Sequence, residues 1–152
     1  MIIECNLSIK DILEQGKKFN WIKPAKCPCC EDSVLWGHGV VFCFFAPLIS
    51  GIYLKRYRCN SCGSVIKLRP IGFFKGFQTP TDTIKKSIRE RLSKKQILYG
   101  PSRASQDYWL RNLKKNVRAI LGENWNHRLL DGFYKLLKQG LIPVSCSIRN
   151  IV

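Results

Sequence analysis

The apolar residues of this chain follow two different spacings, one before and one after residue 78. Between residues 24 and 78 they come in short runs that are rich in β-branched and aromatic side chains and are interrupted by Gly, Pro and Ser. Such runs are typical of strands. Residues 1–23 carry apolar residues at helical spacing, and we expect a short amphipathic helix there that packs as a cap. The predicted strands cover residues 34–36, 40–45, 52–58 and 65–68, with a turn at 37–39.

From residue 79 onward the apolar residues recur every three or four positions, which is the spacing of an amphipathic helix. Thr79-Pro80 has the form of a helix start, and Ser102 is a suitable cap for a second helix. Gly122 and Gly140 are suitable stops for the second and third helices. The predicted inward-facing stripes are Ile84, Ile88 and Leu92, then Trp109, Leu113 and Val117, then Trp125, Leu129, Phe133 and Leu136.

The strongest chemical signal in the sequence is the spacing of four cysteines, which form two Cys-x-x-Cys pairs. Four thiolates supplied by two tight turns match the tetrahedral coordination of a structural zinc ion. Zinc is therefore the predicted cofactor, and it would clamp the base of a β-hairpin to form a zinc ribbon. Cys29 and His38 remain alternative ligands, and two free or redox-active Cys-x-x-Cys motifs remain the alternative to a metal site. The predicted ligands are the two Cys-x-x-Cys pairs Cys27/Cys30 and Cys59/Cys62.

Together these patterns predict an α+β fold, with an N-terminal zinc β-ribbon followed by a three-helix, helix-turn-helix-like module. The expected divisions are a helical cap at 1–23, the ribbon at 24–78 and the helical module at 79–152. The longest apolar run, residues 40–49, is too short to span a membrane. The opening residues lack a basic region followed by an apolar one, so we expect a cytoplasmic protein with no membrane partner.

The charge of the chain is concentrated in its middle. The formal net charge is +16, and residues 53–118 hold seventeen Lys and Arg against three Asp and Glu. A single sign of charge confined to one segment points to a polyanionic partner, of which nucleic acid comes first and an anionic membrane surface second. A solvated surface that serves only solubility is the plain alternative.

The second predicted helix has the division that a DNA-reading helix needs, with an apolar stripe on one side and Arg, Lys, Gln and Asn on the others. Gly100-Pro101 would lie in the turn before it, and the ribbon would add phosphate contacts. We expect double-stranded DNA to be the partner; a plain basic helical bundle is the alternative. The predicted DNA-contacting residues are Lys55, Arg56, Arg58, Arg103, Gln106, Arg111, Lys114, Lys115 and Arg118.

Three segments resemble the N-terminal zinc ribbon of bacterial insertion-element transposases, namely Cys27-Pro28-Cys29-Cys30, Trp36-Gly37-His38-Gly39 and Tyr57 through Gly63. Residues 102–113 are similar to the helix-turn-helix that follows such a ribbon in small mobile-element proteins. The resemblance covers residues 24–121 or thereabouts. It implies zinc on the four paired cysteines, and a cytoplasmic DNA-binding protein that recognises the ends of a mobile element or its own promoter.

The chain departs from those transposases in its carboxylates. Only Glu123 and Asp131 follow residue 118, so the acidic residues of an RNase H-like core are missing, and no nucleophile–base pair stands out. We therefore expect an accessory or regulatory factor that is not an enzyme. One alternative is a protein-interaction adaptor in a nucleoprotein complex, which would use the apolar segment 40–54. The other is an RNA-binding module that would stack bases on Phe42, Phe44, Phe45, Tyr53 and Tyr57.

Overall fold

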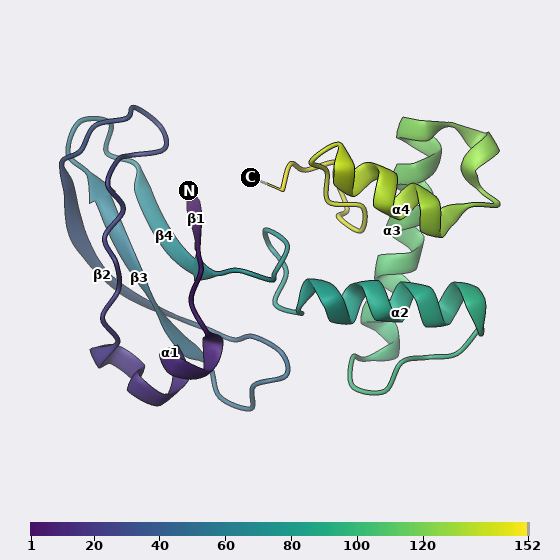
Figure 1. The fold of residues 1–152 in the computed structure, drawn as a ribbon, viewed down its shortest axis with the longest axis horizontal. Coiled ribbons are helices and arrows are strands. Elements are labelled where there is room, and N and C mark those ends of the chain that lie inside the picture. The colour runs from purple at the N-terminus through teal and green to yellow at the C-terminus, as the bar shows by residue number, and fades with distance from the viewer. Residues whose placement is uncertain (152) are drawn as a thin grey trace. The chain divides into compact units, whose positions relative to one another are not determined.

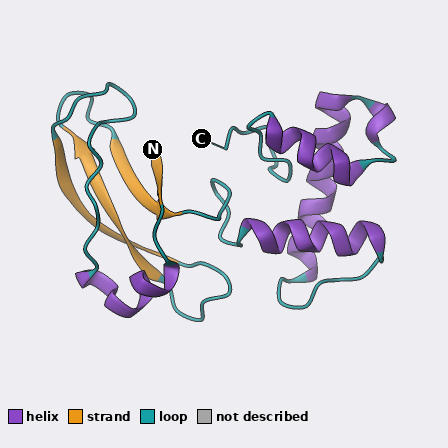
Figure 2. Ribbon diagram, viewed as in Figure 1, coloured by secondary structure: helices purple, strands orange, loops and turns teal. Residues whose placement is uncertain are grey.

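The computed structural model describes residues 1–151 and divides into two compact units, Met1–Phe73 and the part that begins at Phe74. The four strands lie in the first unit, whereas the second unit is helical (Figures 1 and 2). The fold is therefore mixed α+β, as the sequence predicts. Within the described residues, no helix is both long enough and apolar enough to cross a membrane.

The first unit is built on a four-stranded sheet with the strand order β1-β4-β3-β2. β1 pairs with β4 in parallel, whereas β3 lies antiparallel to both of its neighbours. A short helix, α1 (Ile9–Gln15), follows β1, and Ser8 caps it by accepting a hydrogen bond from the backbone N–H of Lys10. The strands are β1 (Ile2–Cys5), β2 (Leu35–Cys43), β3 (Ile52–Cys59) and β4 (Val65–Pro70).

The buried side of β3 changes along its length. Near the loop that joins it to β2, Ile52 and Leu54 are buried, whereas near the cysteine turn Tyr57 and Cys59 are buried. Side chains of a strand alternate between the two faces, so the burial switches from even to odd positions. The face that buries Leu54 is therefore open to solvent at Arg58, which is exposed.

One apolar core holds the first unit together. It joins residues from α1, all of the strands except β1, and the segment before the first cysteine turn, and residues of β1 pack against it. Because the core includes Ile12 and Trp21 from the first 23 residues, this segment belongs to the same packed body as the sheet. The buried residues are Ile12, Trp21, Cys27, Leu35, Phe45, Ile52, Leu54, Tyr57, Cys59, Ile66, Leu68 and Phe73.

The second unit contains three long helices, α2 (Thr81–Ser93), α3 (Arg103–Leu121) and α4 (Leu129–Lys138). Ser102 caps α3, as predicted, because its side chain accepts a hydrogen bond from the Ser105 N–H. The helices share an apolar core of Phe74, Ile84, Ile88, Trp109, Leu113, Val117, Leu129, Phe133, Leu136, Ile142 and Val144.

Helices α3 and α4 approach each other closely at Gly132. A Cβ atom placed on Gly132 would lie 2.9 Å from Cγ2 of Val117, which is closer than such atoms pack. The absence of a side chain on Gly132 therefore permits this helix contact.

Several element boundaries differ from those that the pattern predicts. The helix expected within residues 1–23 is confined to α1, and the strand β1 precedes it. The turn expected at 37–39 is a β-bulge inside the continuous strand β2. The third helix starts later than expected, since Trp125 ends a short 3-10 turn before α4 begins.

Candidate metal centre and basic surfaces

The structure brings the four predicted cysteines together. The Sγ atoms of Cys27, Cys30, Cys59 and Cys62 all lie within 4.8 Å of one another. Two of the separations that join one turn to the other are 3.7 Å, between Cys27 and Cys62, and 3.5 Å, between Cys30 and Cys59. All four thiols are free, and Cys27 and Cys59 are buried. Four sulfur atoms at this spacing could hold a metal ion.

The two Cys-x-x-Cys turns share one backbone hydrogen-bonding pattern. In each turn, the carbonyl of the first cysteine accepts a bond from the N–H four residues on, and its N–H donates to the carbonyl five residues on. These distances are 2.9 and 2.8 Å for Cys27, and 3.1 and 3.0 Å for Cys59. The residue four positions on has a positive φ in both turns, 59° at Glu31 and 69° at Gly63. The turns are therefore close copies of each other.

Contacts outside the sulfur atoms also join the two turns. The Ser61 hydroxyl donates a hydrogen bond to the Asp32 carboxylate, and the Asn60 N–H donates to the Val34 carbonyl at 3.1 Å. The bond from Ser61 is the main reason that the pKa of Asp32 is lowered. Such outer contacts fix the position of ligand-bearing turns, so the protein itself holds the four sulfur atoms close.

The thiols of the cluster differ in acidity. Hydrogen bonds from the side chain and the backbone of Ser64 lower the pKa of Cys62 to about 6. For Cys30, a backbone hydrogen bond at Asp32 lowers the pKa, but hydrogen bonds to Cys59 and the other cysteines raise it to about 12. The thiolate is the form that ligates metals, and the bonds from Ser64 favour that form at Cys62.

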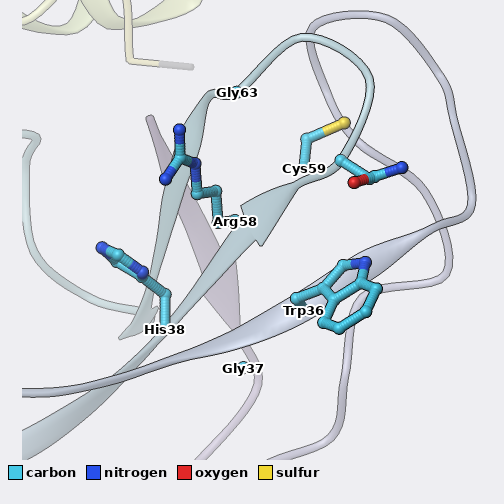
Figure 3. A pocket seen from close by; sticks show the side chains of 7 residues that line it. Trp36, Gly37, His38, Arg58, Cys59 and Gly63 are labelled. Atoms are coloured by element: carbon cyan, nitrogen blue, oxygen red, sulfur yellow. The ribbon is translucent and has the colours of Figure 1, made fainter.

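Cys29 and His38 lie outside the cluster of four. Cys29 is exposed, and its backbone N–H lies 3.4 Å from the Cys27 sulfur, where it serves as a hydrogen-bond donor. His38 lines a pocket on the sheet together with Trp36, Arg58 and the cluster cysteine Cys59 (Figure 3). The grouping of sulfur atoms thus matches the preferred 27/30 and 59/62 pairs.

The predicted DNA-contacting residues of β3 differ in exposure. Arg58 is exposed, whereas Lys55 and Arg56 are half-buried. The Lys55 ammonium lies 6.0 Å from the centre of the Tyr57 ring. Of these three residues, only Arg58 is exposed.

Helix α3 gathers its cations on one side. At about 100° per residue, five exposed basic residues fall within about 120° of the helix circumference. The buried residues Trp109, Leu113 and Val117 lie on the opposite side. The five exposed basic residues are Arg103, Arg111, Lys114, Lys115 and Arg118.

Two of these five cations are paired with carboxylates. Arg103 lies near Asp107, and Arg118 pairs with Glu123. Between residues 1 and 151, the remaining three form no ion pair, although Lys115 donates to the Cys146 carbonyl at 3.2 Å. Lys114, Lys115 and Arg118 also line a surface hollow of about 740 Å³. An anion could approach this side of α3 from solvent.

Gln106 does not contact solvent, and its assignment as a DNA-contacting residue is wrong on this ground. Its side chain is 0% exposed. The Gln106 oxygen accepts bonds from the Ser87 hydroxyl and the Leu98 N–H, both at 2.9 Å. Its amide nitrogen donates to the carbonyls of Leu98 and Pro101 at 2.7 and 3.0 Å. Gln106 therefore holds the connection between α2 and α3.

The spacing of Gln106 was the signal that sequence reasoning missed. Gln106 stands three residues before Trp109, so it falls on the buried side of the same helix. Asn116, on the same side, is also buried, and its amide donates to the carbonyls of Pro143 and Ser145, both at 2.9 Å. Gln106 was assigned to the DNA-contacting side because of its residue type and not because of its position.

Comparison with known proteins gives no relative: no family model, curated protein or solved structure matches this chain. The function must therefore be inferred from the site itself.

Proposed function

We propose that this chain is a zinc-stabilised protein that binds double-stranded DNA, and that it serves as an accessory or regulatory factor of a mobile genetic element. The observation that carries the proposal is the basic side of α3, where five exposed cations lie together and opposite the buried stripe. The proposed action is binding, with no catalytic step.

Zinc is the metal that best suits the four-cysteine cluster. Zinc–sulfur bonds of about 2.3 Å in a tetrahedron place neighbouring sulfur atoms about 3.8 Å apart. The two cross-turn separations of 3.7 and 3.5 Å are close to this edge length. A disulfide would require a separation of about 2.05 Å. The zinc would join the turn before β2 to the turn between β3 and β4, which is the arrangement of a zinc ribbon.

The second unit supplies the proposed DNA-reading helix. α3 would enter the major groove with Arg111 and Lys114 toward the DNA, while α2 supports it in a helix-turn-helix-like arrangement. The connection between α2 and α3 spans residues 94–102, whereas a compact helix-turn-helix has a turn of about three or four residues. The proposal is therefore a variant with a long turn, pinned by the buried Gln106.

The mobile-element role has a narrower basis. It rests on the resemblance of the cysteine turns, the Trp36–Gly39 segment and residues 102–113 to the ribbon and helices of proteins from such elements. Recognition of element ends, or of the element's own promoter, is the proposed task.

A protein-interaction adaptor is the second candidate, and the loop between β2 and β3 favours it. Phe44 and Ile49 in this loop, and Phe42 near the end of β2, are exposed. The ring centres of Phe42 and Phe44 lie 5.2 Å apart in an edge-on arrangement. Apolar side chains gathered on a surface commonly mark a protein contact. An adaptor would bind a protein through this loop and would bind DNA weakly at physiological salt.

The test of DNA binding uses the zinc-loaded full chain and a random-sequence duplex at several salt concentrations. We expect affinity to fall steeply with salt, because each phosphate contact releases a counterion and adds about 0.9 to the logarithmic slope. Arg111→Ala and Lys114→Ala should each weaken DNA binding. A variant that loses a phosphate contact should bind all sequences more weakly and reduce the slope of log affinity against log salt by about one, whereas a variant that loses a base contact should lose affinity for particular sequences.

Lys138→Ala is the matched control, because Lys138 is an exposed cation of the same unit that lies on α4 and not on α3. It removes the same charge from the same unit and should leave affinity within about twofold. Equal losses for Lys138→Ala and Lys114→Ala would mean that only net charge matters, and would overturn the assignment to α3. Salt-independent or absent binding would favour the adaptor.

A further inference from the structure

One face of the sheet in the first unit is both basic and aromatic near the cysteine turns. Residues directly opposite each other on antiparallel strands share a face. Trp36 lies opposite Arg58, and Arg58 lies opposite Val65 on its other side. Arg56, two residues before Arg58, lies opposite Lys67. We call these five residues the open sheet face.

This face is exposed because the buried side of β3 switches. Leu54 is buried on the same side of the strand as Arg58, whereas Arg58, nearer the cysteines, is exposed. The Trp36 side chain is 65% exposed. An indole left in solvent beside an exposed arginine is unusual for a surface that only has to be soluble.

A pocket lies on this face. It has a volume of about 340 Å³, and Trp36, His38, Arg58, Asn60 and Gly63 are among the residues that line it. In Figure 3 the Arg58 side chain extends toward Gly63, and the Trp36 indole and the His38 imidazole flank it. A Cβ atom on Gly63 would lie 3.9 Å from an Arg58 terminal nitrogen, so the guanidinium rests over this glycine.

The cations of the open sheet face are not neutralised by carboxylates. Throughout residues 1–151, no ion pair within 4.0 Å involves Arg56, Arg58 or Lys67. Asp32, in the loop after the first cysteine turn, accepts a hydrogen bond from Ser61 and keeps its negative charge. The pocket thus combines a flat aromatic surface with an arginine that no carboxylate pairs with, and the cluster cysteine Cys59 also lines it.

We propose that this pocket binds one unpaired nucleotide of a single strand, with the base stacked on Trp36 and its phosphate held by Arg58 and His38. A duplex buries the faces of its bases, so only an unpaired base can stack on an indole. Arg58 supplies the forked donors that suit a phosphate. This single-strand site would be a second nucleic-acid contact beside the proposed duplex contact of α3. It rests on the proposed function only in that the partner is nucleic acid in both cases.

The test compares two single strands that carry the same charge. One is a thymidine strand of about eight nucleotides, and the other has abasic sites in place of its central bases. With the zinc-loaded full chain, we expect the intact strand to bind about tenfold more tightly, the effect of one stacked base. Trp36→Ala should abolish this difference, and Trp36→Phe should restore most of it. Arg58→Ala should weaken binding of both strands.

Tyr99→Ala is the matched control, because the Tyr99 side chain is fully exposed and lies in the second unit. It should leave the preference for the intact strand unchanged. Zinc content and thermal unfolding of Trp36→Ala should match those of the parent chain, because Trp36 packs little. A uridine strand that binds with the same dependence on Trp36 would extend the proposal to RNA.

Equal binding of the intact and abasic strands by the parent chain would overturn the proposal. So would an intact strand that binds Trp36→Ala as well as it binds the parent. If duplex DNA fails to bind while the Trp36 effect remains, the duplex function falls and this inference stands. If the duplex binds through α3 and Trp36 makes no difference, this inference falls alone.

Discussion

Glu31 holds the backbone conformation that Gly63 holds in the matching turn. The φ values are 59° and 69°, in the left-handed region that costs a residue with a side chain about 1–2 kcal/mol. The Glu31 side chain is exposed, and among the described residues it forms no ion pair. Its conformation is therefore dictated by the turn and not by a contact of its carboxylate.

Glu31→Gly should raise the stability of the zinc-loaded chain by up to about 1 kcal/mol, after the larger unfolded-state entropy of glycine is subtracted. Gly63→Ala should lower it by about 1 kcal/mol or more. Glu31→Ala is the control, since it removes the carboxylate without giving the backbone freedom. The measurement is thermal unfolding at fixed zinc. A gain of the same size in Glu31→Ala would assign the effect to charge instead.

Gln106 is expected to matter for folding and not for DNA contact. Gln106→Ala would leave the buried N–H of Leu98 and the carbonyls of Leu98 and Pro101 without partners. We expect a loss of about 2 kcal/mol or more in the free energy of unfolding. DNA affinity, measured at a temperature where the variant is still folded, should change far less than in Lys114→Ala. A stable variant with lost affinity would contradict this assignment.

The contrast between Gln106 and the cysteines shows what residue type alone can predict. The Cys-x-x-Cys pairs could be predicted because their spacing is itself typical of metal ligands, and this holds whatever structure the residues between the pairs adopt. Gln106 was assigned to the wrong side of the helix because a carboxamide can form hydrogen bonds either with solvent at the surface or with buried groups, so its type does not predict its location. Its four hydrogen-bonding partners come from α2 and from the 94–102 connection. The local sequence pattern does not predict where that connection lies.

At the scale of elements, local signals predicted more than long-range ones. The helices of the second unit follow from apolar stripes, and the Ser102 cap was found from its type and position. β1 was missed because it is short and pairs in parallel with β4, more than sixty residues away, as the register Ile2 to Lys67 shows. The register shift between Gly37 and Val40 of β2 was missed as well, because it appears only once β2 is paired with β3.

At the contact of α3 with α4, replacing Gly132 by alanine should have two opposite effects on stability, one from helix propensity and one from packing. Alanine is favoured over glycine within a helix by about 1 kcal/mol. At Gly132, however, a methyl group would meet Val117 at 2.9 Å, and a β-branched side chain in a helix has little freedom to move aside. Gly132→Ala should therefore destabilise the protein by about 1–3 kcal/mol.

The double variant Gly132→Ala with Val117→Ala provides the check on this mechanism. It removes the Val117 methyl groups that cause the clash, so the two changes should be less damaging together than the sum of the single effects. Thermal or denaturant unfolding of the four proteins measures this difference. A stabilised Gly132→Ala would show that the helices separate easily and that the close contact is not required.

The whole molecule consists of two units, and we expect the first to depend on a bound metal ion more than the second. The second unit has its own core, with eleven buried apolar residues from Phe74 to Val144. The first unit has twelve, but two of these are the cluster cysteines Cys27 and Cys59. Its cysteine turns are short, and metal affinity in such a site becomes folding free energy. The sequence could indicate this difference, because both pairs lie on the same side of residue 78.

Removal of the metal should therefore unfold one unit and leave the other. With a strong chelator present, hydrogen exchange measured by mass spectrometry should show loss of protection in peptides from β2, β3 and β4, while peptides from α3 and α4 keep theirs. Added zinc should restore the protection. Cys59→Ser should reproduce the effect of the chelator, and Cys146→Ser should not, because Cys146 is exposed and lies outside the cluster. Loss of protection in both units together would mean that α3 depends on the cysteine centre for its fold. No loss in either unit would mean that the core of the first unit suffices without a metal, and the cluster would then need another role.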